Sequence, residues 1–457
     1  KGLWRIIDSI EGDKVIWIIV LLLILISVLA IFSSTPLLSQ ESRIEIMKSH
    51  GKVAIAGLAL IFVLYKFVTK IGIYRFFSQF GFFVSLVLLI LLDGHCKLGF
   101  INAQYLNGAW RTLSLMGVQI HVFEVVKVAM VLYLAWAIHA YKEDQAARSK
   151  KKQVKYFRLL NRLAKAFPKL DKPIWKRMFY MYIPILIICV LTLMGSGSSA
   201  VFIGVILIAT LLIGGMPFRE LALAGIAGVA ALGLIIGVYS ATDGKVFGKF
   251  ERVATMLTRF GAEYDAAERL KNVTPKSREF YDILDEIKQP YSAKIAVHEG
   301  KIIGKNSGNS TQKYVVSNIY GDYMFSFIIE EVGLAGGILI MLLYLSLIAR
   351  CSTIISLCRN EFAKVAIGGL AFLITGQAFL HISVNSGIIP LTGQTLPLLS
   401  DGATAFLTSC LAFGIILSIS KMVNTKMKQV EEAQLRSTDE IQERISQLGQ
   451  IEDEPNL

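Results

Sequence analysis

Charged residues are scarce in this sequence. They make up 18% of the 457 residues, whereas 54% are hydrophobic. This balance excludes an ordinary soluble protein, and repeated apolar runs of about 17 to 25 residues indicate helices that cross a membrane. The sequence also lacks internal repeats and the glycine patterns of a phosphate-binding loop or a dinucleotide-binding turn, so the common nucleotide-binding classes receive no support.

Cysteine is also sparse, with five residues in the whole chain. They are scattered, four lie in or beside apolar runs, and their spacing fits neither a metal site nor an even disulfide framework. We interpret them as small core residues and predict no metal site, while leaving a divalent cation open as a cofactor. These residues are Cys96, Cys189, Cys351, Cys358 and Cys410.

The formal net charge is +13, a value that can indicate nucleic-acid binding. Here the basic residues cluster between apolar runs, where they act as determinants of membrane topology. We therefore predict no nucleic-acid partner.

The apolar runs predict an all-α polytopic membrane protein with about ten transmembrane helices. The expected spans are 15–32, 53–69, 79–93, 119–140, 178–194, 199–215, 221–240, 323–350, 363–384 and 402–420.

Basic residues in the connections predict the orientation. The loop 141–177 holds 13 Lys and Arg from Lys142 onward against three acids, and Lys421, Lys426 and Lys428 follow the last span. Because short basic segments stay in the cytoplasm, both termini are expected there.

This orientation leaves a large loop outside, between spans seven and eight, and its aromatic and helical pattern predicts a structured segment. The predicted parts are an N-terminal membrane part (1–240), an extracytoplasmic loop (241–322), a C-terminal membrane part (323–422) and a cytoplasmic tail (423–457).

Three acids lie where a polar loop enters the predicted eighth span. Asp322 directly precedes the apolar run, and Glu330 and Glu331 lie inside it. A charged side chain at the centre of a bilayer costs about 3 kcal/mol or more, so acids at such depths are candidates for function. The alternative for Asp322 is a helix N-cap.

The loop before Asp322 carries cations and small polar residues. Lys305 and Lys313 can bind phosphate as point charges, or they are ordinary solvated lysines. Ser310 and Gln312 belong to the same polar stretch.

A second group lies in the predicted fourth span, where Glu124 and Lys127 are one helical turn apart and share a face. They form either a structural ion pair or a pair that tunes the site. Arg111, just upstream, can meet a lipid phosphate or serve as an interfacial arginine.

A third group is the segment 381–404, in which prolines and glycines interrupt the helix. Broken backbone at membrane depth requires cover from protein or a polar cavity. Asn385, Thr392 and Ser400 belong to this segment. We interpret Asp401 as a helix cap and His381 as a core histidine.

Three motifs together resemble the SEDS family of cell-wall polymerases (shape, elongation, division and sporulation). They are NSTQKYVVSNIYGDYMFSFIIEEVGLAGG, VNSGIIPLTGQTLPLLSDGAT and FEVVKVAMVLYLAW, and they span most of the chain in the family's order. The motifs resemble the division branch, FtsW, in Bacteroidetes-type form, more than the elongation branch, RodA.

The resemblance implies a peptidoglycan glycosyltransferase that polymerises lipid II into glycan strands and releases undecaprenyl pyrophosphate. It implies that Asp322 is the catalytic residue. The predicted substrate-binding residues are Arg111, Lys305, Ser310, Gln312, Lys313, Asn385, Thr392 and Ser400. The predicted structural or tuning residues are Glu124, Lys127, Glu330 and Glu331.

The expected partners are lipid II, the growing glycan strand, a class B penicillin-binding protein, other divisome proteins and membrane lipids. The expected location is the bacterial inner membrane at the division septum. Three alternatives stay open: a flippase for lipid-linked precursors, an elongation-type polymerase and a non-enzymatic scaffold.

Overall fold

A computed structural model describes ten stretches of the chain: 11–35, 43–106, 109–150, 156–157, 167, 172–242, 266, 268–275, 277–316 and 319–452. Parts of the predicted basic loop 141–177 and of the loop 241–322, together with the last five residues of the predicted tail, therefore lie outside the described residues.

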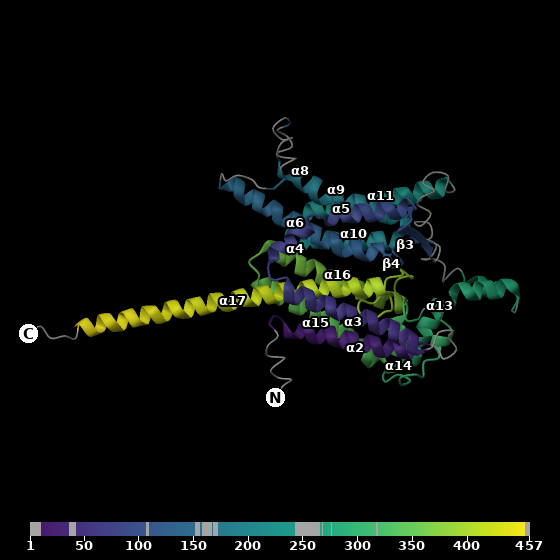
Figure 1. Ribbon diagram of the computed structural model, residues 1–457. Helices are drawn as coiled ribbons and strands as arrows, with labels where there is room; N and C mark the ends of the chain where they lie inside the picture. The colour runs from purple at the N-terminus through teal and green to yellow at the C-terminus, as the bar shows by residue number, and fades with distance from the viewer. Residues whose placement is uncertain are drawn as a thin grey trace, which may run out of the picture.

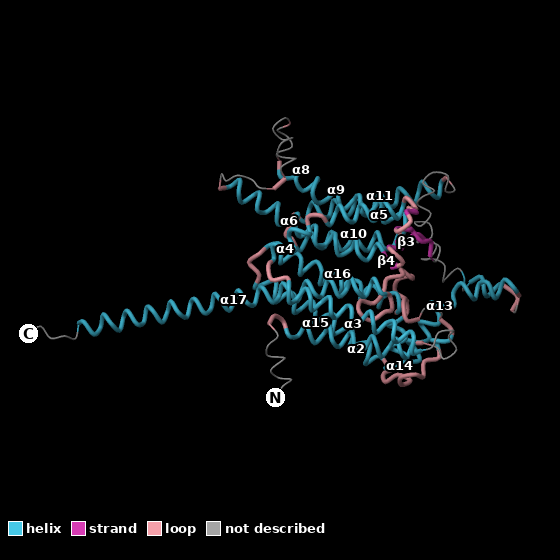
Figure 2. Tube along the Cα trace, in the orientation of Figure 1, coloured by secondary structure: helices cyan, strands magenta, loops and turns pink. Residues whose placement is uncertain are grey.

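Most of the described chain is helical, and the helices lie side by side in one bundle (Figures 1 and 2). The first half contains α2 (Lys14–Ser34), α3 (Arg43–Phe67), α4 (Ile71–Ser78), α5 (Gly81–Asp93), α6 (Val122–Ser149), α8 (Pro173–Arg177), η2 (Met178–Tyr182), α9 (Ile183–Gly195) and α10 (Gly197–Ile213). The second half contains α11 (Phe218–Ala241), α13 (Arg278–Gly300), η4 (Gln312–Tyr314), α14 (Met324–Val332), α15 (Leu334–Leu357), α16 (Glu361–Asn385) and α17 (Ala403–Glu452).

Eight helices within the described residues are long and apolar enough to cross a membrane, and nine result if the bent pair α4 and α5 is one span. Helix α10 is also apolar but has 17 residues. The predicted helical membrane protein is confirmed, whereas the count of ten stays a prediction. Helices α6, α16 and α17 are the most buried candidate spans, so the core of the bundle lies among them.

A small antiparallel sheet is the main departure from the all-helical expectation. Its strands run in chain order as β1 (Lys97–Leu98), β2 (Ile101–Leu106), β3 (Ala109–Leu115) and β4 (Val118–His121). Met116 and Gly117 join β3 to β4, both with positive φ, as a two-residue hairpin turn requires. The sheet lies at the end of the bundle where α13 and α14 also lie (Figure 2).

The predicted span 323–350 is wrong as a single helix. It divides at Gly333, whose φ of 88° is a left-handed conformation that favours glycine, and α15 begins one residue later. The amide of Leu334 donates to the Lys301 carbonyl at 2.9 Å, and the amide of Lys305 donates to the Glu330 carbonyl at 2.9 Å. The segment after α13 thus forms hydrogen bonds with backbone groups that have no helical partner at the break.

Close backbone contact explains why glycines occur where the end of α13 and the residues after it pack against α14. A Cβ at Gly300 would lie 2.1 Å from the Ile329 carbonyl oxygen, and one at Gly304 would lie 2.4 Å from that of Glu331. Helix α14 is therefore a short buried helix held against the end of α13, separate from the membrane-spanning α15.

Candidate functional site

Asp322 lies in the turn that precedes α14 and is half-buried. Its backbone carbonyl accepts a hydrogen bond from Nδ2 of Asn385 at 3.1 Å. The same Asn385 side chain uses its oxygen to accept from the amide of Ser326 at 2.9 Å and from the Ser326 hydroxyl at 2.8 Å. One asparagine at the end of α16 therefore connects Asp322 to the first turn of α14.

The first turn of α14 receives its hydrogen bond from Asn385, a residue distant in sequence. The residue at the N-cap of α14 is Tyr323, and it makes no side-chain cap hydrogen bond. Asn385 satisfies a free amide of the first turn from a distant part of the chain, which is the role a local cap would have. At the Ser326 amide, Asn385 thus takes the place that a local cap would have.

The segment between α16 and α17 holds the same turn from its other side. The hydroxyl of Ser400 donates to the Gly321 carbonyl at 2.8 Å, and the amide of Asp401 donates to the Tyr320 carbonyl at 2.9 Å. Ser400 also accepts from the amide of Leu396 at 2.9 Å. The predicted broken segment therefore positions the backbone around Asp322.

A buried polar network inside the bundle supports this broken segment. The ammonium group of Lys127 donates to Glu124 at 2.7 Å, to Oε1 of Gln377 at 2.7 Å and to Oε1 of Gln394 at 3.1 Å. Gln394 in turn donates to the Ser199 hydroxyl at 3.1 Å. Lys127 is 3% exposed, so its charge is satisfied by oxygen atoms from two helices and from the broken segment.

The Glu124–Lys127 pair predicted from the sequence is thus present, and it is part of a larger set. Gln377 and Gln394 were not singled out as candidates from the sequence. Gln377 is a polar residue within a long apolar run, and Gln394 lies in the broken segment that was already singled out, which are the signals that could have identified them.

A cavity of about 470 Å³ opens between α10 and α16. Apolar side chains of both helices line most of it, including Phe202 and Phe379. Its polar lining residues are Arg111, Ser196, Ser198, Ser383 and Thr392. A cavity with long apolar walls and a cationic arginine in its lining suits a molecule with a long hydrocarbon part and an anionic end.

The Arg111 guanidinium lies beside the broken segment, because a Cβ at Gly393 would be 3.8 Å from Nη1 of Arg111. The Ser198 hydroxyl donates to the Thr392 carbonyl at 2.9 Å. Strand β3, the start of α10 and the broken segment thus meet at one end of the cavity.

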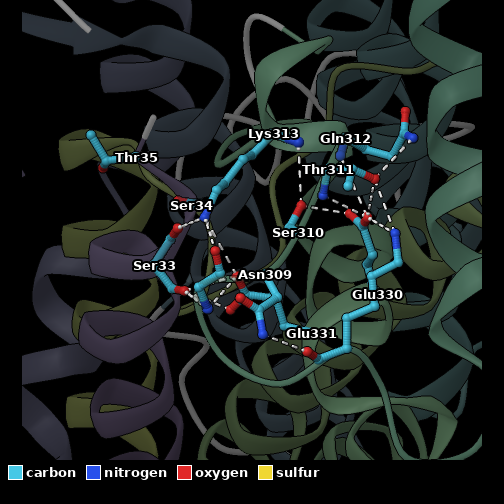
Figure 3. Close-up of polar contacts among 12 residues, drawn as sticks. Ser33, Ser34, Thr35, Asn309, Ser310, Thr311, Gln312, Lys313, Glu330 and Glu331 are labelled. Carbon is cyan, nitrogen blue, oxygen red and sulfur yellow. Dashed lines mark hydrogen bonds and ion pairs between the residues drawn. The ribbon is translucent and has the colours of Figure 1, made fainter. Parts of the chain in front are cut away.

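The loop 305–313 folds over α14 and binds Glu330 (Figure 3). The Glu330 carboxylate accepts from the Ser310 hydroxyl at 2.5 Å, from the Thr311 amide at 2.9 Å and from the Lys305 ammonium at 2.9 Å. Lys305 also contacts Glu299 at the end of α13.

Glu331 points to a second cluster at the end of α2 (Figure 3). It accepts from the Ser33 hydroxyl at 2.6 Å and from the amide of Gly308 at 2.9 Å. The ammonium group of Lys313 lies 3.9 Å from Glu331 and donates to the carbonyls of Gly308 at 2.7 Å and Ser33 at 3.2 Å. Ser33 was not predicted, since nothing in an apolar first span indicates its partner.

Hydrogen bonding controls the ionisation of Glu330 and Lys305. Burial would raise the pKa of Glu330, but the hydrogen bonds from Ser310, Lys305 and Thr311 outweigh it, so its pKa lies below the ordinary value. Burial would lower the pKa of Lys305, but its hydrogen bonds to Glu299 and Glu330 outweigh that effect and raise the pKa. Both groups are held in their charged forms.

The structure thus brings some predicted site residues together and separates others. Asn385 and Ser400 adjoin Asp322, whereas Arg111 and Thr392 line the cavity between α10 and α16. Lys305, Ser310 and Lys313 bind Glu330, Glu331 and backbone carbonyls, and Gln312, in η4, donates through its amide nitrogen to Thr311 at 3.4 Å.

Within the described residues, no group of three or more His, Cys, Asp or Glu side chains could hold a metal ion.

Most of this chain matches one known protein family. The model of the cell cycle protein family FtsW/RodA/SpoVE matches residues 13–425. The chain belongs to the FtsW/RodA/SpoVE family. The predicted membership in this group of cell-wall polymerases is confirmed.

Curated relatives of this FtsW/RodA/SpoVE protein carry enzyme names. The chain is 27% identical over 379 residues to the "Probable peptidoglycan glycosyltransferase FtsW" of Coxiella burnetii, an alignment that spans 80% of this chain and 83% of the relative. It is also 27% identical over 368 residues to the protein of the same name from Enterococcus hirae, with 78% of each covered. A shorter region is 34% identical to "Peptidoglycan glycosyltransferase MrdB" of Escherichia coli, covering 28% of this chain and 35% of that protein.

Solved structures share the fold of this family member. A chain from "Structural coordination of polymerization and crosslinking by a peptidoglycan synthase complex" aligns with a TM-score of 0.60 at 18% identity, covering 90% of this chain and 97% of that one. The Thermus thermophilus rod shape determining protein RodA aligns with a TM-score of 0.54 at 17% identity, covering 90% and 98%. The predicted multi-pass membrane architecture is confirmed by this agreement.

Proposed function

We propose that this chain is a peptidoglycan glycosyltransferase that polymerises lipid II during septal cell-wall synthesis, with Asp322 as the general base. The single observation that carries the proposal is the position of Asp322, a half-buried carboxylate whose turn is held by Asn385 and Ser400. The names of the curated relatives support the reaction class. The FtsW names among them favour the division role over an elongation role.

The reaction requires a general base and positive charge at the leaving group. A base removes the proton from the acceptor sugar hydroxyl, whose oxygen attacks the anomeric carbon of the donor while the bond to the pyrophosphate oxygen breaks. Asp322 supplies the base, and rigid support of its backbone keeps the carboxylate oriented for that proton. Positive charge is needed where the pyrophosphate leaves.

The cavity between α10 and α16 suits the lipid-linked part of the substrate. Its apolar walls would hold a polyprenyl tail, and Arg111 would steady a phosphate through charge-assisted hydrogen bonds. Thr392 supports this assignment, because the residue lines the cavity and its hydroxyl has no hydrogen-bond partner among the described residues.

Lys305 and Lys313 are less suited to that role in the observed arrangement. Each already serves a carboxylate or backbone carbonyls, and moving either to a phosphate would leave a buried acid without its cation. We therefore assign both lysines, with Ser310, Gln312, Glu330 and Glu331, to holding the loop 305–313 on α14.

The orientation follows from the basic connections, which favour the cytoplasm. Asp322, the sheet and α13 would then face the outside of the inner membrane, where lipid-linked precursors are joined. The structural relative described as a peptidoglycan synthase complex supports a class B penicillin-binding protein as partner, alongside other divisome proteins at the septum.

The test is polymerisation of purified lipid II by purified protein carrying Asp322→Asn. Asparagine has nearly the shape of aspartate but cannot accept the proton, and a general base contributes roughly 10²–10⁴ in rate, so polymerisation should fall by about that factor. The matched control is Asp282→Asn on the exposed side of α13, which should retain the wild-type rate. Polymerisation by Asp322→Asn at the wild-type rate would refute the base assignment.

A further inference from the structure

A second cavity is lined by residues at the start of α4 and in α17. Figure 1 shows the start of α4 and the point where α17 leaves the bundle at the end away from the sheet and α14. The volume of the cavity is about 520 Å³. The charged side chains in its lining are Lys70, Arg75, Lys421 and Lys426, with Glu11 as the acid. Cations from two separate parts of the chain therefore converge on one space.

Two of these cations are positioned by neighbours. Arg75 donates from Nη1 to Nε2 of His139 at 2.8 Å. Lys421 pairs with Glu11 at 3.1 Å and lies 4.7 Å from the centroid of the Tyr65 ring. Because one carboxylate faces four cations, the cavity keeps an excess of positive charge that attracts an anion.

The first turn of α4 adds hydrogen-bond donors to this cavity. Ile71 and Gly72 both line it, and Lys70, at the N-cap, makes no side-chain cap hydrogen bond. Free amides at a helix start favour negative charge. A Cβ at Gly72 would meet nothing within 4 Å, so there is open space beside this turn.

The cavity lies where two candidate membrane spans end, which is the expected position of the membrane surface. Lys70 follows the span Ile44–Phe67, and Lys421 lies in the last part of the span Ala403–Met427. Farther along α4, Phe76 and Phe77 are 56% and 67% exposed and stack edge to face. A single short helix thus presents polar donors to the cavity and aromatic rings outside it, as elements at the lipid headgroup boundary do.

We propose that this cavity binds the phosphate head group of an anionic phospholipid, with the acyl chains lying along the exposed phenylalanines of α4. The four cations and the first amides of α4 would hold the phosphate. Basic pockets between membrane helices bind such head groups. The position of the cavity beside the ends of two membrane spans favours a lipid over a soluble phosphate.

The experiment uses the full chain in phosphatidylethanolamine nanodiscs with increasing cardiolipin, and native mass spectrometry reports the bound lipid. Each lysine near an anionic head group is worth about fivefold in affinity, so Lys70→Gln with Lys426→Gln should weaken cardiolipin binding about thirtyfold. The matched control is Lys14→Gln with Lys66→Gln, which removes two charges at the same end of the bundle but outside the cavity, and it should bind as the wild type does.

A second arm adds inorganic pyrophosphate as a competitor. Cardiolipin should stay bound, and displacement at comparable concentrations would show that the site takes soluble phosphates and would overturn the lipid assignment. Wild-type affinity in the double variant would overturn the site itself. If the double variant melts at a lower temperature than the wild type in lipid-free detergent, the single variants are tested, each with an expected loss of about fivefold.

Discussion

At the residue scale, the candidate base depends on partners far away in sequence. The Asp322 turn is held by Asn385 and Ser400, which lie 63 and 79 positions from the residues they contact. Two hydrogen bonds to backbone carbonyls restrict the peptide that carries the Asp322 side chain. Substitutions at the supporting residues can therefore separate positioning from proton transfer.

Asn385→Ala should remove both functions of that side chain. Loss of a helix-capping contact costs about 1 kcal/mol of stability, and a looser Asp322 turn should lower lipid II polymerisation by about a hundredfold. Asn385→Asp keeps an acceptor for the Ser326 amide but cannot donate to Asp322, so it should lose activity with less loss of melting temperature. Wild-type polymerisation by both variants would contradict the positioning role.

Lys127→Met should destabilise the protein strongly. It leaves the half-buried Glu124 without its cation and removes a donor from Gln377 and Gln394, and breaking a buried pair costs about 3–5 kcal/mol. Adding Glu124→Leu to the same chain should restore part of the melting temperature in detergent. Equal melting of the wild type and Lys127→Met would show that the network is peripheral.

At the element scale, the break at Gly333 gives α14 a different role from the predicted membrane span. The loop 305–313 closes over α14 through Glu330 and Glu331, which are buried and fully bonded to that loop and to α2. Because each carboxylate accepts several hydrogen bonds, the docking of the loop depends on both acids remaining ionised.

The docked loop should therefore open in acid. The pKa of Glu330 is below its ordinary value of 4.5, so its stabilising effect is complete above pH 4.5 and is lost as the pH falls through the folded-state pKa. Hydrogen exchange of the 305–313 amides should accelerate in that acidic range. Glu330→Gln should exchange rapidly already at neutral pH, and an unchanged exchange rate in this variant would argue against the role of the carboxylate.

At the scale of the whole molecule, the two ends of the bundle differ in chemistry. One end carries the sheet, α13 and the Asp322 turn, and the other carries the convergent cations and the long extension of α17 (Figure 1). This polarity is what an enzyme that joins lipid-linked sugars on one side of a membrane requires.

Cysteine labelling tests the orientation in intact cells. In a chain with Cys96→Ser, an introduced Lys271→Cys should react with a membrane-impermeant maleimide, because the loop 241–322 is expected outside. Met427→Cys should react only after permeabilisation, because the positive-inside rule assigns its end of α17 to the cytoplasm. The reverse pattern would overturn the topology and the proposed side of catalysis together.

Several predictions from the sequence rested on strong local signals. Long apolar runs located most spans because a bilayer requires continuous hydrophobic length, and the segment 381–404 was recognised from the prolines and glycines that interrupt it. The sheet was missed because the segment 94–118 was treated only as a connection between spans. The break at Gly333 was missed because apolar residues continue on both sides of that glycine.

By itself, the sequence determined the helical membrane class, the family and which residues are candidates for chemistry, since hydropathy and motifs depend on neighbouring residues. The tertiary structure alone decided how those residues combine. It paired Lys305 with Glu330, joined Lys127 to the broken segment and placed Asn385 on the Asp322 turn. Buried polar groups take partners from whichever element lies closest in space, because an unsatisfied charge or amide inside the bundle costs more free energy than the folding of a distant segment against it.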